Sequence, residues 1–295
     1  MRSGFGRWVL QHRGARVGLI AGLLPLPLTG VLSAAIVVTV AVAKGWREAV
    51  FDAVAAMLVL AIVTAIAGGM WSQIAISGVS TWSVAILLGT VTGVYGSLTL
   101  ALQALLVIAL VGLVVFLLVV GDTIGFWEGV LSNFAEQMSE LGMQFSEPDA
   151  LLQLAPTMSG LVGASVVSSS MIALIIGAWW ASGSGGPAFR QMFVQIRLGY
   201  VLGAVAVLAG VGTFFLPGET AGNALLVLSV GFVFQGLAVV HWLVSARGLP
   251  WVVLVPVYLP FFMGASISVM ALFLLASVGF VDNWYNLRRA GSNVR

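Results

Sequence analysis

The sequence has no cysteine and few charged residues. The absence of cysteine excludes disulfides, thiolate metal sites and catalysis by a cysteine nucleophile. Only 7% of the 295 residues are charged and 60% are hydrophobic, whereas roughly a quarter of the residues in a soluble domain are charged. So few charges do not cover the surface of a soluble fold of this length. The lipid bilayer must therefore be the solvent for most of the chain.

Sequence signatures of enzymes and of nucleotide binding are also missing. The chain has no Walker lysine motif, no HExxH, no GxSxG and no GxGxxG. The two histidines, His12 and His241, have no carboxylate nearby in the sequence to complete a metal site. The net charge of +2 is too small to indicate nucleic-acid binding. We expect no enzyme activity and no cofactor, metal or nucleic-acid partner; a membrane enzyme using backbone and carboxylate groups alone is the open alternative.

Long intervals without a charged residue define the membrane segments. They cover residues 17–43, 53–121, 150–189, 198–218, 220–246 and 248–281. A spanning helix needs about 20 apolar residues at a rise of 1.5 Å each. The second interval is therefore predicted to hold three helices, with breaks near Gly68 and between Gly93 and Gly96. With one helix each in 150–189, 198–218 and 220–246, the sequence predicts six clear spans in an all-α bundle.

The first and last intervals are interrupted by proline and glycine. The interruptions are Pro25, Pro27 and Gly30 near the start of the chain, and Pro256, Pro260 and Gly264 near its end. Proline removes a backbone donor and breaks the helical ladder. Each interval is therefore one kinked helix, or a pair of short helices that forms a hairpin or re-enters the membrane. The total is eight to ten membrane segments in a single integral membrane domain over residues 1–295.

The distribution of charge favours the paired arrangement. If each interrupted interval begins and ends on the same side, all twelve basic residues share that side: Arg2, Arg7, Arg13, Arg16, Lys44, Arg47, Arg190, Arg197, Arg247, Arg288, Arg289 and Arg295. The other side then carries only acids: Asp122, Glu128, Glu136, Glu140, Glu147, Asp149 and Glu219. The positive-inside rule favours this arrangement, with both termini in the cytoplasm. A cleaved N-terminal leader is the alternative, but its apolar region is unusually long and contains two prolines.

Residues 121–150 form the one acidic and amphipathic stretch, predicted to be an insertion on the extracytoplasmic side. The stretch has six acids and no base, and apolar residues recur at three- and four-residue steps from Phe126 to Phe145. This spacing predicts an amphipathic helix. The helix either lies on the outer rim of the bundle or serves as a lid or docking site for a partner.

Polar residues inside the apolar intervals are the candidates for a pocket or a polar network, because such groups are costly in a membrane. These candidates are Asp52, Gln103, Asn223, Gln235 and His241. Each has a simpler structural role. Asp52 then lies at the interface near Lys44 or Arg47, the amides bond between helices, and His241 lies near a helix end.

A second candidate site is a charge cluster at the cytoplasmic end of the last segment, formed by Arg197, Arg247, Asp282, Arg288 and Arg289. We expect the last helix to continue through Leu287, so that Trp284 and Arg288 form an i, i+4 pair suited to a cation–π contact. Arg197 or Arg247 is then expected to supply the cation closest to Asp282. The alternative is a solvated carboxylate at the headgroup level.

Small residues at four-residue spacing indicate close helix packing. They occur as Gly18xxxGly22, Gly199xxxGly203 and Ala206xxxGly210.

Three stretches together resemble the YybS-like family of uncharacterised bacterial polytopic membrane proteins. They are "LSAAIVVTVAVAKG", "FQGLAVVHWLVSARGLPW" and the closing "GFVDNWYNLRR". The chain departs from the family at "GTVTGVYGSLTL", which is uncharged where the family usually has arginines. More remotely, the family is similar to the substrate-binding membrane subunits of energy-coupling vitamin transporters, although the AxxxA docking motif of those subunits is missing from the first helix.

The resemblance implies a small-molecule transport component energised by a separate ATPase module. The competing hypothesis is a non-transporting scaffold or regulatory protein that binds protein partners. The acidic 121–150 stretch and the basic cytoplasmic face favour that second hypothesis.

Overall fold

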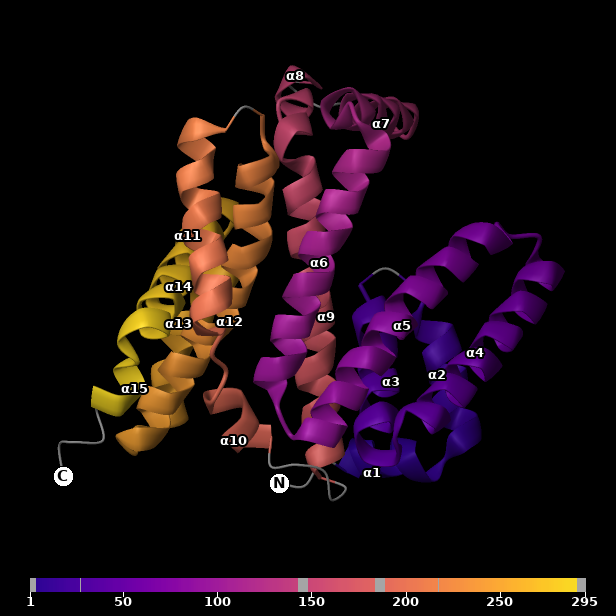
Figure 1. The fold of residues 1–295 in the computed structure, drawn as a ribbon. Coiled ribbons are helices and arrows are strands. Elements are labelled where there is room, and N and C mark those ends of the chain that lie inside the picture. The colour runs from indigo at the N-terminus through magenta and orange to yellow at the C-terminus, as the bar shows by residue number, and fades with distance from the viewer. Residues whose placement is uncertain (1–3, 27, 143–147, 184–188, 217, 291–295) are drawn as a thin grey trace. The chain divides into compact units, whose positions relative to one another are not determined.

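The structure is a computed structural model that describes residues 4–26, 28–142, 148–183, 189–216 and 218–290 (Figure 1). These residues form helices and connecting turns, with no strand among them. The chain divides into two compact units. Unit 1 comprises Met1–Leu105 and Ser168–Arg197, and unit 2 comprises Leu106–Val167 and Leu198–Arg295. The boundary passes through two long helices, α6 and α9.

Six helices of the described chain are long and apolar enough to cross a membrane. They are α4 (Trp46–Ala67), α5 (Trp71–Tyr95), α6 (Leu98–Val120), α9 (Met158–Ser182), α12 (Thr220–Ala246) and α14 (Ala265–Tyr285). The chain therefore has the length and apolar composition of a multi-pass integral membrane protein. The predicted breaks are confirmed, because Gly68 and Gly96 end α4 and α5 in the left-handed conformation.

One of the six spans differs from the prediction. The interval 198–218 holds α11 (Gly199–Phe215), which at 17 residues is shorter than the other candidates. Its place among the six long helices is taken by α14, which lies in the interrupted final interval.

Unit 1 is built around α3 (Gly30–Lys44). Every residue from Ser33 to Ala41 is buried, and α3 packs against α2 (Arg13–Leu23), α4 and α5. Glycines of the neighbouring helices allow the close approach. A Cβ added at Gly89 would lie 2.7 Å from the Ala41 side chain, and one added at Gly177 would lie 2.6 Å from the backbone oxygen of Ala35. A short, small-residue helix is thus enclosed by protein.

The interrupted N-terminal interval is a pair of short helices. Between α2 and α3, the Thr29 hydroxyl donates to the carbonyl oxygen of Leu23 at 2.7 Å. A side chain therefore satisfies a backbone carbonyl group that has no helical partner where α2 ends. At the other end of the pair, Lys44 donates to the carbonyl oxygen of Leu10 at 2.8 Å. Leu10 belongs to α1 (Gly4–Gln11). The C-terminal end of α3 therefore lies beside the last turn of α1, just before α2 begins.

Unit 2 is built around α12, which packs against α11 and α14. The interrupted C-terminal interval begins with three short elements: the 3-10 helix η2 (Trp251–Leu254), α13 (Val255–Tyr258) and the 3-10 helix η3 (Leu259–Phe262). Pro256 and Pro260 lie in the first turns of α13 and η3, where a missing N–H leaves no hydrogen bond unmade. Gly264, with φ 105°, is the N-cap of α14. In Figure 1, the end of α14 and the following α15 (Leu287–Ala290) lie beside the last part of α12.

The acidic stretch forms α7 (Thr123–Glu140), as predicted. Gly121, with φ 70°, ends α6, and the carboxylate of Asp122 accepts from the backbone N–H of Gly125 at 2.9 Å as the N-cap of α7. The Trp127 indole donates to the Ser159 hydroxyl at 2.8 Å. Residues 143–147, including Phe145, lie outside the described residues; α8 (Pro148–Leu152) and η1 (Ala155–Thr157) follow.

Candidate functional site

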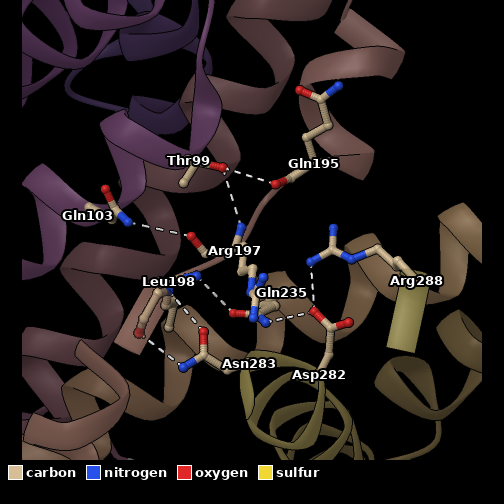
Figure 2. A network of polar contacts seen from close by, with 10 residues as sticks. Thr99, Gln103, Gln195, Arg197, Leu198, Gln235, Asp282, Asn283 and Arg288 are labelled. Atoms are coloured by element: carbon tan, nitrogen blue, oxygen red, sulfur yellow. Dashed lines mark hydrogen bonds and ion pairs between the residues drawn. The ribbon is translucent and has the colours of Figure 1, made fainter. Parts of the chain in front are cut away.

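Two buried carboxylates, one in each unit, are the centres of the two polar clusters of interest. Asp52 and Asp282 both have no exposed surface. We call their surroundings the Asp52 cluster (Leu10, Arg13, Arg16, Lys44 and Asp52) and the Asp282 cluster (Leu198, Gly199, Gln235, Asp282, Asn283 and Arg288). The Asp282 cluster is shown in Figure 2.

The Asp282 cluster depends on a turn that the sequence analysis predicted wrongly. The helix does not continue through Leu287: α14 ends at Tyr285, and Asn286 adopts the left-handed conformation with φ 48° and ψ 61°. Asparagine tolerates this conformation better than most residues. The chain then folds back, and the Arg288 guanidinium lies 2.6 Å from Oδ2 of Asp282.

This turn also changes the identity of the partner cation. Within unit 2, Arg288 supplies an ion pair to Asp282, and Arg247, one of the two expected cations, is exposed at the end of α12. Arg288 and Trp284 no longer lie one turn apart on a single helix; Trp284 instead packs beside Tyr200, with ring centroids 5.8 Å apart. The solvated alternative is wrong as well, because Asp282 is fully buried.

Gln235 joins the carboxylate to the start of α11. Its amide nitrogen donates to Oδ2 of Asp282 at 2.8 Å, and its amide oxygen accepts from the backbone N–H of Leu198 at 2.9 Å. Asn283 holds the next residue, since its oxygen accepts from Gly199 N–H at 2.9 Å and its nitrogen donates to the Gly199 carbonyl at 3.0 Å. The Gln235 and Asn283 side chains therefore provide hydrogen-bond partners for backbone groups at the start of α11, which apolar neighbours would leave unsatisfied.

The closest helix approach in unit 2 lies beside this cluster. A Cβ added at Gly279 would collide with the carbonyl oxygen of Phe232, and one added at Gly236 would collide with the carbonyl oxygen of Leu275. The two glycines therefore let the backbones of α12 and α14 touch, as small residues do in membrane helix pairs. The contact sets Gln235 and Asp282 within hydrogen-bonding distance.

The electrostatics of the Asp282 cluster are incompletely balanced. Arg288 and Gln235 both act on Oδ2, whereas Oδ1 is buried without a hydrogen-bond partner among the described residues. A buried carboxylate normally fills its acceptor sites, because desolvation of an ion is costly. The free acceptor at Oδ1 suits a hydrogen-bond donor such as an amine, a hydroxyl or a water molecule.

In the Asp52 cluster, two arginines hold one carboxylate. Arg16 is buried and lies 2.6 Å from Oδ2 of Asp52, whereas Arg13, more than half exposed, lies 3.0 Å from Oδ1. Arg16 and Lys44 also donate to the carbonyl oxygen of Leu10, at 3.3 and 2.8 Å. Asp52 thus pairs with Arg16 and Arg13 and joins the start of α2 to α4.

The remaining candidates lie elsewhere. Within unit 1, the Gln103 side chain donates to the carbonyl oxygen of Arg197 at 3.5 Å. Within unit 2, Asn223 accepts from Gly160 N–H at 2.7 Å and donates to the Pro156 carbonyl at 2.9 Å, which confirms its structural role.

His241 contacts a neighbouring tyrosine, and Arg247 lies on the surface of unit 2. His241 lies 2.8 Å from the Tyr258 hydroxyl, and Arg247 is exposed at the end of α12. Arg289 belongs to α15, but its side chain lies outside the described residues. Of the candidates in unit 2, Gln235 enters the Asp282 cluster.

The sequence analysis missed several residues that complete the clusters. Arg13 and Arg16 were counted only as topology signals, and Asn283 was not singled out although it follows Asp282 directly. A signal was available for the arginines: their spacing of three residues places both on one face of a helix. No comparable signal predicts that Asn283 bonds the backbone of Gly199.

The clusters do not have the composition of a metal centre. Within the described residues, no group of three or more His, Asp and Glu side chains lies close enough to hold a metal ion. Each carboxylate is instead held by arginine, and only Asp282 keeps an acceptor oxygen without a partner among the described residues.

Comparisons with protein-family models, with curated proteins and with solved structures give no match.

Proposed function

We propose that the chain is a multi-pass protein of a bacterial cytoplasmic membrane, with both termini on the cytoplasmic side. The basic residues all lie on one side under this topology. The hydrogen bond between Lys44 and Leu10 supports it, because the N-terminal helix pair begins and ends together. The clustering of α15 with the last part of α12 supports the same arrangement at the other end of the chain.

Within that membrane, the protein acts as the substrate-binding component of a small-molecule transport system. The observation that carries this proposal is the buried Asp282, one of whose acceptor oxygens has no hydrogen-bond partner among the described residues. Ionisable groups in spanning helices commonly mark substrate or ion pathways. The resemblance to substrate-binding subunits points the same way, and an ATPase module on a separate chain would supply the energy. The proposal gives the protein no catalytic role.

Native mass spectrometry tests the proposal. Protein purified from its own membranes in mild detergent is expected to carry a small-molecule adduct, and an ATPase chain is expected to copurify with it. The Asp282→Asn variant should lose the adduct, whereas Asn223→Ala, which removes a buried amide outside the Asp282 cluster, should keep it. Folded wild-type protein that carries no adduct and no ATPase chain would refute transport.

A scaffold or regulatory role is the second candidate, and α7 favours it. Glu128, Glu136 and Glu140 are exposed on this helix, with no basic residue between Asp122 and Glu140. Such a surface suits a basic protein partner. A stable complex that lacks an ATPase chain and dissociates when these three acids are changed to glutamine would establish this role in place of transport.

A further inference from the structure

Helix α7 and the residue that caps it carry a row of apolar side chains that are partly exposed. Phe126, Val130, Phe134 and Leu141 are 44, 41, 45 and 68% exposed, and we call them the apolar stripe of α7. They follow one another at steps of four, four and seven residues, so they lie along one side of the helix. Phe126 begins this row and also helps to attach α7 to the rest of unit 2.

A neighbouring face of α7 also contacts the rest of unit 2. Leu131 is buried, and Trp127 donates to Ser159 at 2.8 Å. Ser132, Glu128 and Glu136 lie on a third side and are exposed. Around the helix, the protein-facing residues lie between the apolar stripe and Glu128. Glu128, Ser132 and Glu136 therefore point away from the stripe, whereas Glu140 lies near its edge.

The apolar stripe continues an apolar surface of α6. Val115, Leu118 and Val119, in the last turns of α6, are 52, 79 and 79% exposed. The two surfaces meet through aromatic rings, because Phe116 and Phe126 pack edge-to-face with centroids 5.5 Å apart. The exposed face of a spanning helix with this composition is a lipid-facing surface.

We propose that α7 is an interfacial helix whose apolar stripe inserts into the lipid of the leaflet at the end of α6. Amphipathic helices lie in the interface plane with their apolar side at the boundary between headgroups and acyl chains. Here the acids face water on the other side. The depth is set by the junction of Phe116 and Phe126, and the binding does not require anionic lipid, because α7 supplies no basic residue to attract it.

Single-cysteine labelling tests this insertion directly, because the chain has no cysteine of its own. The full chain carrying Val130→Cys is labelled with an environment-sensitive fluorophore and placed in phosphatidylcholine nanodiscs. Some nanodiscs contain lipid with a nitroxide quencher near the headgroup. We expect several-fold stronger quenching at position 130 than at Ser132→Cys, two residues away on the acidic side. Val115→Cys is the positive control for contact with acyl chains.

Aqueous iodide completes the experiment. It should quench the label at position 132 strongly and the label at position 130 weakly. Strong iodide quenching at position 130 would overturn the proposal by placing the stripe in water. Protection of position 130 from both quenchers would overturn it as well, because protein, either the chain itself or a second copy, would then cover the stripe.

Discussion

At the scale of single residues, Asp282 shows how an aspartate is tolerated at the end of an apolar helix. The carboxylate opposes the helix dipole and is fully desolvated. The left-handed turn at Asn286 brings Arg288 back within 2.6 Å, and Gln235 adds a hydrogen bond from α12. The charge of Asp282 is therefore compensated mainly by Arg288, six residues further along the chain, and Gln235 of α12 adds one hydrogen bond.

The first prediction concerns this ion pair. Arg288→Met leaves a buried carboxylate without its cation and should destabilise the protein by about 3–5 kcal/mol. Adding Asp282→Asn should recover much of the loss, because no buried charge then remains. Thermal unfolding in mild detergent measures both effects, with Arg247→Met, an exposed arginine, as the control. Equal stability of Arg288→Met and Arg247→Met would show that the pair contributes nothing.

The second prediction separates the two arginines of the Asp52 cluster. The Arg16 side chain is 1% exposed and the Arg13 side chain is 59% exposed. Arg16→Met should therefore lower stability by about 3–5 kcal/mol, and Arg13→Met by less than about 1 kcal/mol. The same unfolding assay compares the two variants. A larger effect at Arg13 would contradict the assignment of Arg16 as the principal partner of Asp52.

At the scale of helices, only some of the glycines at four-residue spacing lie where two helices pack closely. Gly18, Gly22 and Gly210 belong to the predicted small-residue motifs, yet a Cβ added to any of them meets no atom within 4 Å. Gly203 of the predicted motifs does lie at a close contact, with the Asn283 side chain, but the tightest crossing uses Gly236 and Gly279, which have no partner at four-residue spacing in the predicted motifs. A small residue is needed only where another backbone lies opposite, and the sequence of one helix does not contain that information.

The third prediction follows from this contrast. Gly279→Ala places a methyl group against the Phe232 carbonyl oxygen, which is backbone and cannot rotate away. We expect a loss of about 1–3 kcal/mol, as for other overpacked cores. Gly210→Ala, on α11 and facing open space, should change stability by less than about 1 kcal/mol. Thermal unfolding of the two variants side by side tests this, and equal effects would mean that the crossing of α12 and α14 is looser than described.

The helices and their breaks were largely predictable, and their contacts were not. Intervals without charge located α4, α5, α6, α9 and α12, because length and polarity alone decide whether a segment tolerates lipid. Gly68 and Gly96 marked helix ends for a local conformational reason. The turn at Asn286 and the pairing of Asp52 with Arg16 depend on tertiary packing. A periodic pattern does not encode such contacts.

At the scale of the whole molecule, the placement of basic residues makes the topology testable. The fourth prediction is that a reporter enzyme active only outside the cytoplasm gives no signal when fused after Arg295. The same reporter inserted after Glu140, in the acidic stretch, should be active. Immunoblotting of the fusions controls for expression. Activity at the C-terminal fusion, with comparable protein levels, would exclude the paired arrangement of the interrupted segments.

The position of α3 in unit 1 has a consequence for biosynthesis. This helix touches Gly177 of α9, where the Thr39 hydroxyl lies 3.2 Å from the glycine carbonyl oxygen. Unit 1 is thus closed by Ser168–Arg197, which the ribosome makes after the intervening Leu106–Val167 of unit 2. The ribosome adds roughly 5–20 residues per second, so roughly 8–30 s pass between the synthesis of α3 and the synthesis of its last neighbour. During that time its small-residue surface is open to an insertase or chaperone, so assembly of unit 1 is necessarily late in translation.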